Sequence, residues 1–161
     1  MLTPQNTAYI AAEYTVLCAA LGITPVTLDV FEVDDDPTST SLSQHGNRLS
    51  DGNARYSASK KVLVRPLCDG DPKPTGPVSF PPSGLSKWSA EWPSWRIDLW
   101  HEVVHQVADH LGVHNPHEPG RPRADGSKSD EGHGAGFWQA MQSVAGAFFY
   151  LPADLDSLLD R

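Results

Sequence analysis

The sequence is poor in cysteine and in clustered positive charge, and each shortage argues against a class of protein. Only two cysteines, Cys18 and Cys68, occur in 161 residues, and no CxxC spacing suggests a zinc ribbon or a redox pair. We expect both to be buried free thiols. Twelve basic residues against twenty acidic ones give a formal net charge of −8. This balance disfavours a dedicated nucleic-acid binder, because phosphate contacts need clustered Lys and Arg.

Long apolar runs are also missing. No segment approaches the roughly 18 apolar residues of a membrane span, and the N-terminus lacks the features of a secretory signal. We therefore expect a cytosolic protein, or one carried inside a larger assembly such as a viral, phage-like particle. The composition, 39% hydrophobic and 20% charged, is typical of a globular domain, and the length predicts a single domain over residues 1–161.

Hydrophobic periodicity and turn residues predict the elements. A helix is expected from Pro4 to Gly22 and strands over about 26–33 and 54–67. Residues 37–53 are polar and predict a loop, and the proline-rich stretch of about 69–93 predicts an insertion. Three helices follow: one from an N-cap at Ser94 to Gly112, one over about 134–149, and a short one near the C-terminal end.

The predicted helix after Ser94 contains the motif His101-Glu102-Val103-Val104-His105, which matches HExxH. Residues four apart lie on one face of a helix, so two imidazoles can reach one metal ion. Glu102 lies beside the first histidine and can act as a base toward water bound to the metal. The apolar residues continue through both x positions, as a buried active-site helix requires. The motif therefore predicts a catalytic zinc site.

A catalytic zinc usually takes three protein ligands, so a third must lie outside the motif. The metzincin continuation fails, because Ala108 and Leu111 stand where Gly and His are required. His110 lies about 140° around the helix from His105 and cannot reach the same ion. His114 and His117, in the following loop, stay open as alternatives.

His133 is the stronger candidate. It lies in Gly132-His133-Gly134-Ala135-Gly136-Phe137, at the start of the predicted helix 134–149. The flanking glycines allow the backbone to approach the motif helix closely, and Phe137 falls on the same helical face as His133. Glu131 is the competing ligand, because other HExxH enzymes take a carboxylate from a later helix. We favour His133. The position of Glu131 needs no metal to explain it, because the helix dipole already stabilises a carboxylate near a helix N-terminus.

The pair of motifs, HEVVH and GHGAGF, resembles the SprT-like (Spartan-type) zinc metallopeptidases over about residues 54–149. The resemblance implies an α+β fold: a small zincin-like metalloprotease domain whose HExxH helix packs against a short β-sheet, with additional helices at both ends. It also implies Zn²⁺ as cofactor, His101, His105 and His133 as ligands, Glu102 as the catalytic base, and a protein or peptide substrate. The acidic charge and the lack of a cysteine-rich ribbon depart from the family and argue against DNA-linked activity.

Several assignments stay open. Asp109 either orients a ligand imidazole or belongs to a solvated helix face, and Tyr150, His114 and His117 are candidates for stabilising an oxyanion. A strand at about 58–67 is expected to pair with an extended substrate. Packing in the core is the expected role of four tryptophans: Trp88, Trp92, Trp95 and Trp100. The alternatives to a peptidase are a catalytically idle protease-fold protein with a binding or structural role, and a purely structural zinc site.

Overall fold

The computed structural model describes residues 4–32, 54–58, 62–67, 92, 94–123 and 126–160. This part of the chain is a small, mostly helical domain with four helices and a three-stranded sheet. In chain order the elements are α1 (Pro4–Leu21), β1 (Thr27–Glu32), β2 (Arg55–Ser57), β3 (Val62–Leu67), α3 (Ser94–His110), α4 (Ala135–Ala147) and α5 (Pro152–Leu159).

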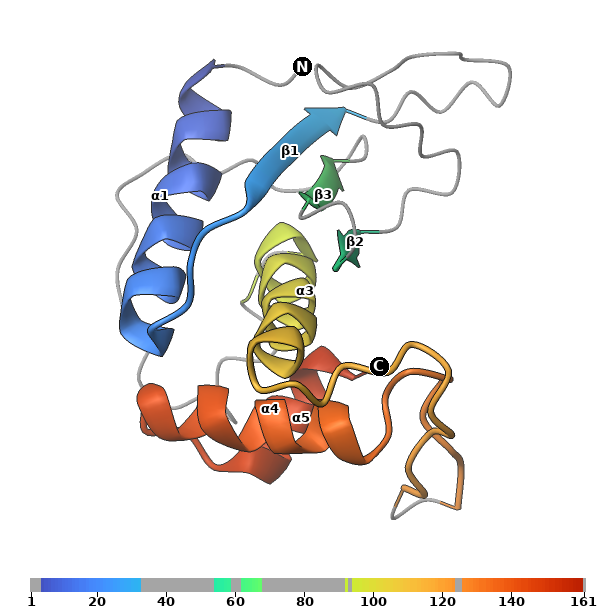
Figure 1. Ribbon diagram of the computed structural model, residues 1–161. Helices are drawn as coiled ribbons and strands as arrows, with labels where there is room; N and C mark the ends of the chain where they lie inside the picture. The colour runs from blue at the N-terminus through green and yellow to red at the C-terminus, as the bar shows by residue number, and fades with distance from the viewer. Residues whose placement is uncertain are drawn as a thin grey trace, which may run out of the picture.

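Helix α3 lies at the centre of the molecule. In Figure 1 the sheet lies on one side of α3, and α4 and α5 lie on the other. Its apolar residues face both layers, and seven of them are almost completely buried: Trp95, Leu99, Trp100, Val103, Val104, Val107 and Ala108. A helix that is apolar on more than one face is suited to this central position. The core therefore forms around the motif helix.

The end of α3 is set by Gly112, as the sequence predicts. Gly112 has a φ of 73°, a left-handed conformation that favours glycine. The N–H of Val113 donates to the carbonyl of Ala108, and the N–H of Gly112 donates to that of Asp109. This pair of hydrogen bonds is a Schellman motif, which satisfies the last carbonyls of the helix and turns the chain away.

The predicted strand 54–67 is wrong as a single element. The structure divides it into β2 and β3, which pair antiparallel with Ser57 opposite Val62. The polar sequence Ser59-Lys60-Lys61 interrupts the apolar alternation between them. The strand order is β1-β3-β2, and β1 pairs parallel with β3 from Thr27–Val62 to Glu32–Leu67.

This strand order corrects the expectation about substrate pairing. Because β3 lies between β1 and β2, both backbone edges of residues 62–64 are already hydrogen-bonded within the sheet. Residues that are paired on both sides cannot accept a further strand, so the expectation fails for residues 62–64, whereas residues 65–67 are paired with β1 alone among the described strands. Of the strands that the structure describes, β2 is the edge strand on the far side of β3 from β1.

The N-terminal helix and the aromatic core agree with the predictions. Helix α1 ends at Leu21, and Gly22 follows with a φ of 66°. Trp92, Trp95 and Trp100 are buried in the core. Cys18 is a buried free thiol. Cys68, Trp88, the predicted loop 37–53 and most of the proline-rich stretch lie outside the described residues.

The described helices do not include any that has both the length and the apolar character needed to cross a membrane.

Candidate metal centre

Three histidine side chains meet between α3 and the start of α4. His101 and His105 lie one turn apart on α3, and His133 comes just before the first residue of α4. The Nε2 atom of His133 is 3.0 Å from Nε2 of His101 and 3.2 Å from Nε2 of His105. All three ligand atoms lie within 4.8 Å of one another, so this group can hold a metal ion.

The chemistry of the three nitrogens fits a cation better than it fits hydrogen bonds. The Nδ1–H of His101 donates to the carbonyl oxygen of Leu159 at 2.5 Å, which leaves a lone pair on its Nε2. A proton on Nε2 of His133 cannot point at both neighbours at once. Zinc–nitrogen bonds of about 2.0–2.1 Å in a tetrahedral site place ligand nitrogens roughly 3.3 Å apart. The separations of 3.0 and 3.2 Å in this site are close to that value.

Burial keeps the two motif histidines, His101 and His105, in the form that binds metal. It lowers the pKa of His101 below its ordinary value, although the hydrogen bond to the Leu159 carbonyl acts in the opposite direction. Burial also lowers the pKa of His105 to about 2, and the neighbouring His101, His133 and His114 add to the effect. Both imidazoles are therefore neutral near pH 7, as metal ligation requires.

Phe137, in the first turn of α4, packs against the whole cluster. Its ring centroid lies 5.2 Å from that of His101, 4.9 Å from that of His105 and 4.7 Å from that of His133. The Phe137 side chain is 1% exposed. This contact agrees with the expectation that Phe137 and His133 share one face, and it limits how far the three rings can turn.

Glu118 holds the segment that carries His133. Its carboxylate accepts hydrogen bonds from the backbone N–H groups of Gly134, Gly136 and Phe137 at 2.9–3.2 Å. These are N–H groups at the beginning of α4, which have no partners within the helix. A carboxylate at a helix N-terminus is also favoured by the helix dipole. Glu118 thus fixes α4, and with it the backbone at His133.

The glycines around His133 act differently from the expectation. A Cβ at Gly134 would lie 2.3 Å from the carbonyl oxygen of Pro119, and one at Gly136 would lie 2.2 Å from that of Val113. The close approach is therefore to the loop after α3, and not to α3 itself. Gly132 has a φ of 86°, so it also needs the freedom of glycine.

The competing ligands lie elsewhere. His117 donates from Nδ1 to Oε1 of Glu131 at 2.8 Å, and their side chains are 84% and 63% exposed. The His114 ring lies 5.8 Å from that of His105, beside the cluster but not within the group of three. His110 is exposed at the end of α3. Of the histidines considered after the motif, only His133 joins the group of three.

The remaining candidates have other contacts. Asp109 accepts a hydrogen bond from the hydroxyl of Tyr56 at 2.6 Å, so it does not lie on a simply solvated face. Tyr150 packs against the rings of Trp92 and Trp100. Glu102 is 8% exposed on α3, directly after His101. The motif helix therefore keeps this carboxylate in a largely buried position.

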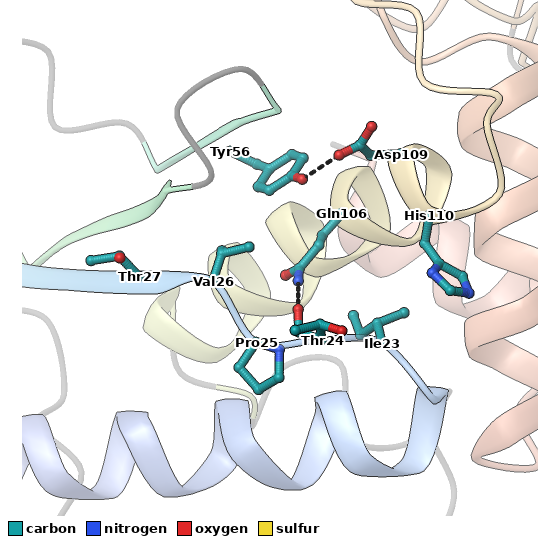
Figure 2. Close-up of a pocket in the computed structure, with 9 residues that line it drawn as sticks. All are labelled: Ile23, Thr24, Pro25, Val26, Thr27, Tyr56, Gln106, Asp109 and His110. Carbon is teal, nitrogen blue, oxygen red and sulfur yellow. Dashed lines mark hydrogen bonds between the residues drawn. The ribbon is translucent and has the colours of Figure 1, made fainter.

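A pocket of about 560 Å³ lies along α3 on the side of α1 and β1. Figure 2 shows Gln106 and Asp109 extending from α3 toward it, with Tyr56 bonded to Asp109 and Thr24 bonded to Gln106. Residues 23–27 make up most of the described residues that line this pocket. None of the three clustered histidines lines it. It is a separate feature from the metal centre.

Three charged residues near the cluster were missed by the sequence reasoning: Glu118, Arg121 and Asp160. The Arg121 guanidinium donates to the carbonyl oxygen of His133 at 2.7 Å and to the carboxylate of Asp160 at 3.2 Å. Glu118 and Arg121 lie in a polar loop, and Asp160 is 27 positions after His133. Local patterns carry no signal for such distant contacts.

No family model matches the chain, and neither a curated protein nor a solved structure matches it.

Proposed function

We propose that this chain is a zinc metallopeptidase of the SprT-like kind, with a zincin-like fold, in which His101, His105 and His133 hold the metal. The observation that carries the proposal is that three Nε2 atoms meet at one place. Two of them, from His101 and His105, come from the helix that also contains Glu102. Three histidines suit a catalytic site better than a structural one, because closed structural zinc sites usually include cysteine. Zinc bound there would polarise the scissile carbonyl and lower the pKa of a water molecule.

Glu102 is the general base of the proposed reaction. It follows His101 directly and is not one of the three clustered residues, so its proposed role is to take a proton from the attacking water and not to bind the metal. The same carboxyl group then passes that proton to the leaving amine. Glu102 is largely buried, so bulk water screens its charge only weakly. Its electrostatic interactions with the reacting groups are therefore stronger than they would be at the surface.

The proposed substrate is an extended protein or peptide. Because residues 62–64 of β3 are paired on both sides, we take β2, one of the two edge strands of the described sheet, as the candidate for pairing with a substrate backbone. The net charge of −8 argues against DNA as the partner. We propose that the whole of residues 1–161 acts as one such domain.

The test compares wild type with Glu102→Gln, after reconstitution with zinc. The variant keeps the three histidines, so it is expected to retain about one zinc per chain while losing hydrolysis of an unfolded protein substrate. Loss of a general base lowers the rate by about 10²–10⁴-fold. The matched control is Glu131→Gln, which changes an exposed carboxylate near the site and should leave the rate within about twofold of wild type.

Near-wild-type turnover by Glu102→Gln would contradict the assigned role. If wild type binds zinc but cleaves nothing, the chain is instead a catalytically idle protease-fold protein.

A further inference from the structure

The imidazole of His133 has one ring nitrogen whose environment the proposed zinc site does not explain. Its Nε2 faces His101 and His105, whereas its Nδ1 is buried and has no hydrogen-bond partner. The carboxylate oxygen Oδ1 of Asp160 lies 4.0 Å from this Nδ1, just beyond hydrogen-bond distance. The Asp160 side chain is 3% exposed, so solvent scarcely screens the pair.

Asp160 is held firmly by three side chains. Its Oδ2 accepts a hydrogen bond from Ser129 at 2.6 Å and another from Arg121 at 3.2 Å. Arg123 lies 3.4 Å from Oδ1 and also donates to the backbone carbonyl of Asp160 at 2.7 Å. A carboxylate oxygen can accept more than one hydrogen bond, so Oδ1 keeps capacity for His133.

Arg121 ties this carboxylate to the candidate ligand. One of its nitrogens, Nη1, donates to the backbone carbonyl of His133, while Nη2 binds Asp160. The guanidinium is planar and rigid, so it fixes the backbone of His133 relative to the acid that faces the same residue's imidazole. Figure 1 shows α5, which Asp160 follows directly, beside α4 in the layer below α3.

Leu159, the residue before Asp160, binds a second histidine of the cluster. The carbonyl of Leu159 accepts the Nδ1–H of His101, so two consecutive residues at the end of α5 face two of the three imidazoles. Metal-bound histidines almost always donate their other ring N–H to a carboxylate or a carbonyl, which fixes both the tautomer and the ring orientation. Leu159 already does this for His101.

We propose that Asp160 is a positioning residue of the metal centre: it holds His133 with its proton on Nδ1, so that Nε2 presents a lone pair to the metal. The inference rests on the proposed zinc site. It assigns to the end of α5 a part in metal binding that neither motif indicates. The acid acts through His133 and does not contact the metal itself.

The test measures zinc affinity by competition with a chelator, in wild type, Asp160→Ala, Asp160→Asn and Asp156→Ala. Loss of an outer-sphere partner lowers metal affinity by about 10–100-fold, which is the result expected for Asp160→Ala. Asp160→Asn retains an oxygen acceptor and should recover most of that affinity. Asp156 lies four residues earlier and binds the same Nη2 of Arg121, so Asp156→Ala is the matched control and should stay within about threefold of wild type.

A spectroscopic measurement separates positioning from general stability. In the zinc-loaded wild type, ¹H–¹⁵N NMR should show an Nδ1–H signal of His133 that is protected from exchange, and Asp160→Ala should lose that protection. Wild-type affinity in Asp160→Ala would overturn the inference, as would an equal loss in Asp156→Ala or an exchange-exposed Nδ1–H in wild type. If wild type itself binds no zinc, the proposed function falls and the inference falls with it.

Discussion

His133 and Glu131 lie two positions apart, and the structure gives them very different surroundings. His133 contacts Phe137 and the two motif histidines, and its side chain is 15% exposed. Glu131 pairs with His117 at the surface. An exposed contact of this kind contributes little, about 0–1 kcal/mol. The side chain that joins the cluster is thus the histidine, whereas the carboxylate belongs to the exposed loop.

Alanine substitutions at His133 and Glu131 compare these two positions directly. His133→Ala removes one of three proposed ligands, so zinc affinity should fall by more than the roughly 10–100-fold typical of an outer-sphere change. Glu131→Ala should leave affinity within about threefold of wild type. Chelator competition measures both. A larger effect at Glu131 than at His133 would make the ligand set two histidines and a glutamate, and would contradict the proposed SprT-like assignment.

At the residue scale, the sequence identified the members of the cluster but not what orients them. The i, i+4 spacing of His101 and His105 is a local property of a helix, and the glycines mark His133 as a residue in a tight approach. The backbone carbonyl of Leu159 accepts the Nδ1–H of His101, and the carboxylate of Asp160 lies 4.0 Å from Nδ1 of His133. They become neighbours only when α5 packs beside α4, and a single sequence carries no local pattern for that contact.

At the element scale, α4 is the helix whose position decides whether His133 reaches the site. Its N-terminus has no side-chain cap from Gly134, and the carboxylate of Glu118 supplies the acceptors instead. The loop after α3 is thereby joined to the start of α4. Because Gly134 and Gly136 lack side chains, the two segments can approach closely enough for this contact.

Replacing Glu118 tests how the start of α4 is held. Replacing it with alanine leaves three backbone N–H groups without their acceptor, so the free energy of unfolding of the metal-free protein should fall by about 1–3 kcal/mol. Zinc affinity should fall as well, because the backbone at His133 is no longer fixed. Urea unfolding measures the first effect, with Glu131→Ala as a control expected to change stability by less than about 0.5 kcal/mol. Unchanged stability in Glu118→Ala would show that water replaces the carboxylate without loss.

The helices were predictable because each has an apolar periodicity and a clear boundary. Gly22 and Gly112 ended α1 and α3 where expected, and both have positive φ values. The division of 54–67 into β2 and β3 was not predicted, because short β segments alternate in the same way as one long strand. Strand order depends on contacts between distant segments, so the enclosed position of β3 could not be derived from its own residues.

At the scale of the whole molecule, a buried ion pair joins α1 to α3. Oε1 of Glu13 accepts a hydrogen bond from Nε of Arg96 at 2.8 Å, and the Glu13 side chain is fully buried. Burial raises the pKa of Glu13 from its ordinary value of 4.5 to about 7, even though Arg96 acts in the opposite direction. The carboxyl group therefore links global stability to pH.

The sign of this dependence follows from the proton balance. Between pH 4.5 and about 7 the folded state holds a proton on Glu13 that the unfolded state has released. Its contribution to the free energy of unfolding must then decrease as the pH rises through this range. Between about pH 5 and 8, wild type should lose about 2 kcal/mol relative to Glu13→Gln, which cannot titrate. Urea unfolding at both pH values measures this, and parallel pH profiles for the two proteins would show that the pKa of Glu13 is not raised.

Locating the metal shows whether three histidines from two distant segments hold one zinc ion. Crystals of the zinc-loaded protein, measured with X-rays on both sides of the zinc absorption edge, give an anomalous difference map. We expect one strong peak per chain, about 2.0–2.1 Å from Nε2 of His101, His105 and His133. A peak that touches Glu131 or His117 in place of His133, or a loaded crystal with no peak at this cluster, would contradict it.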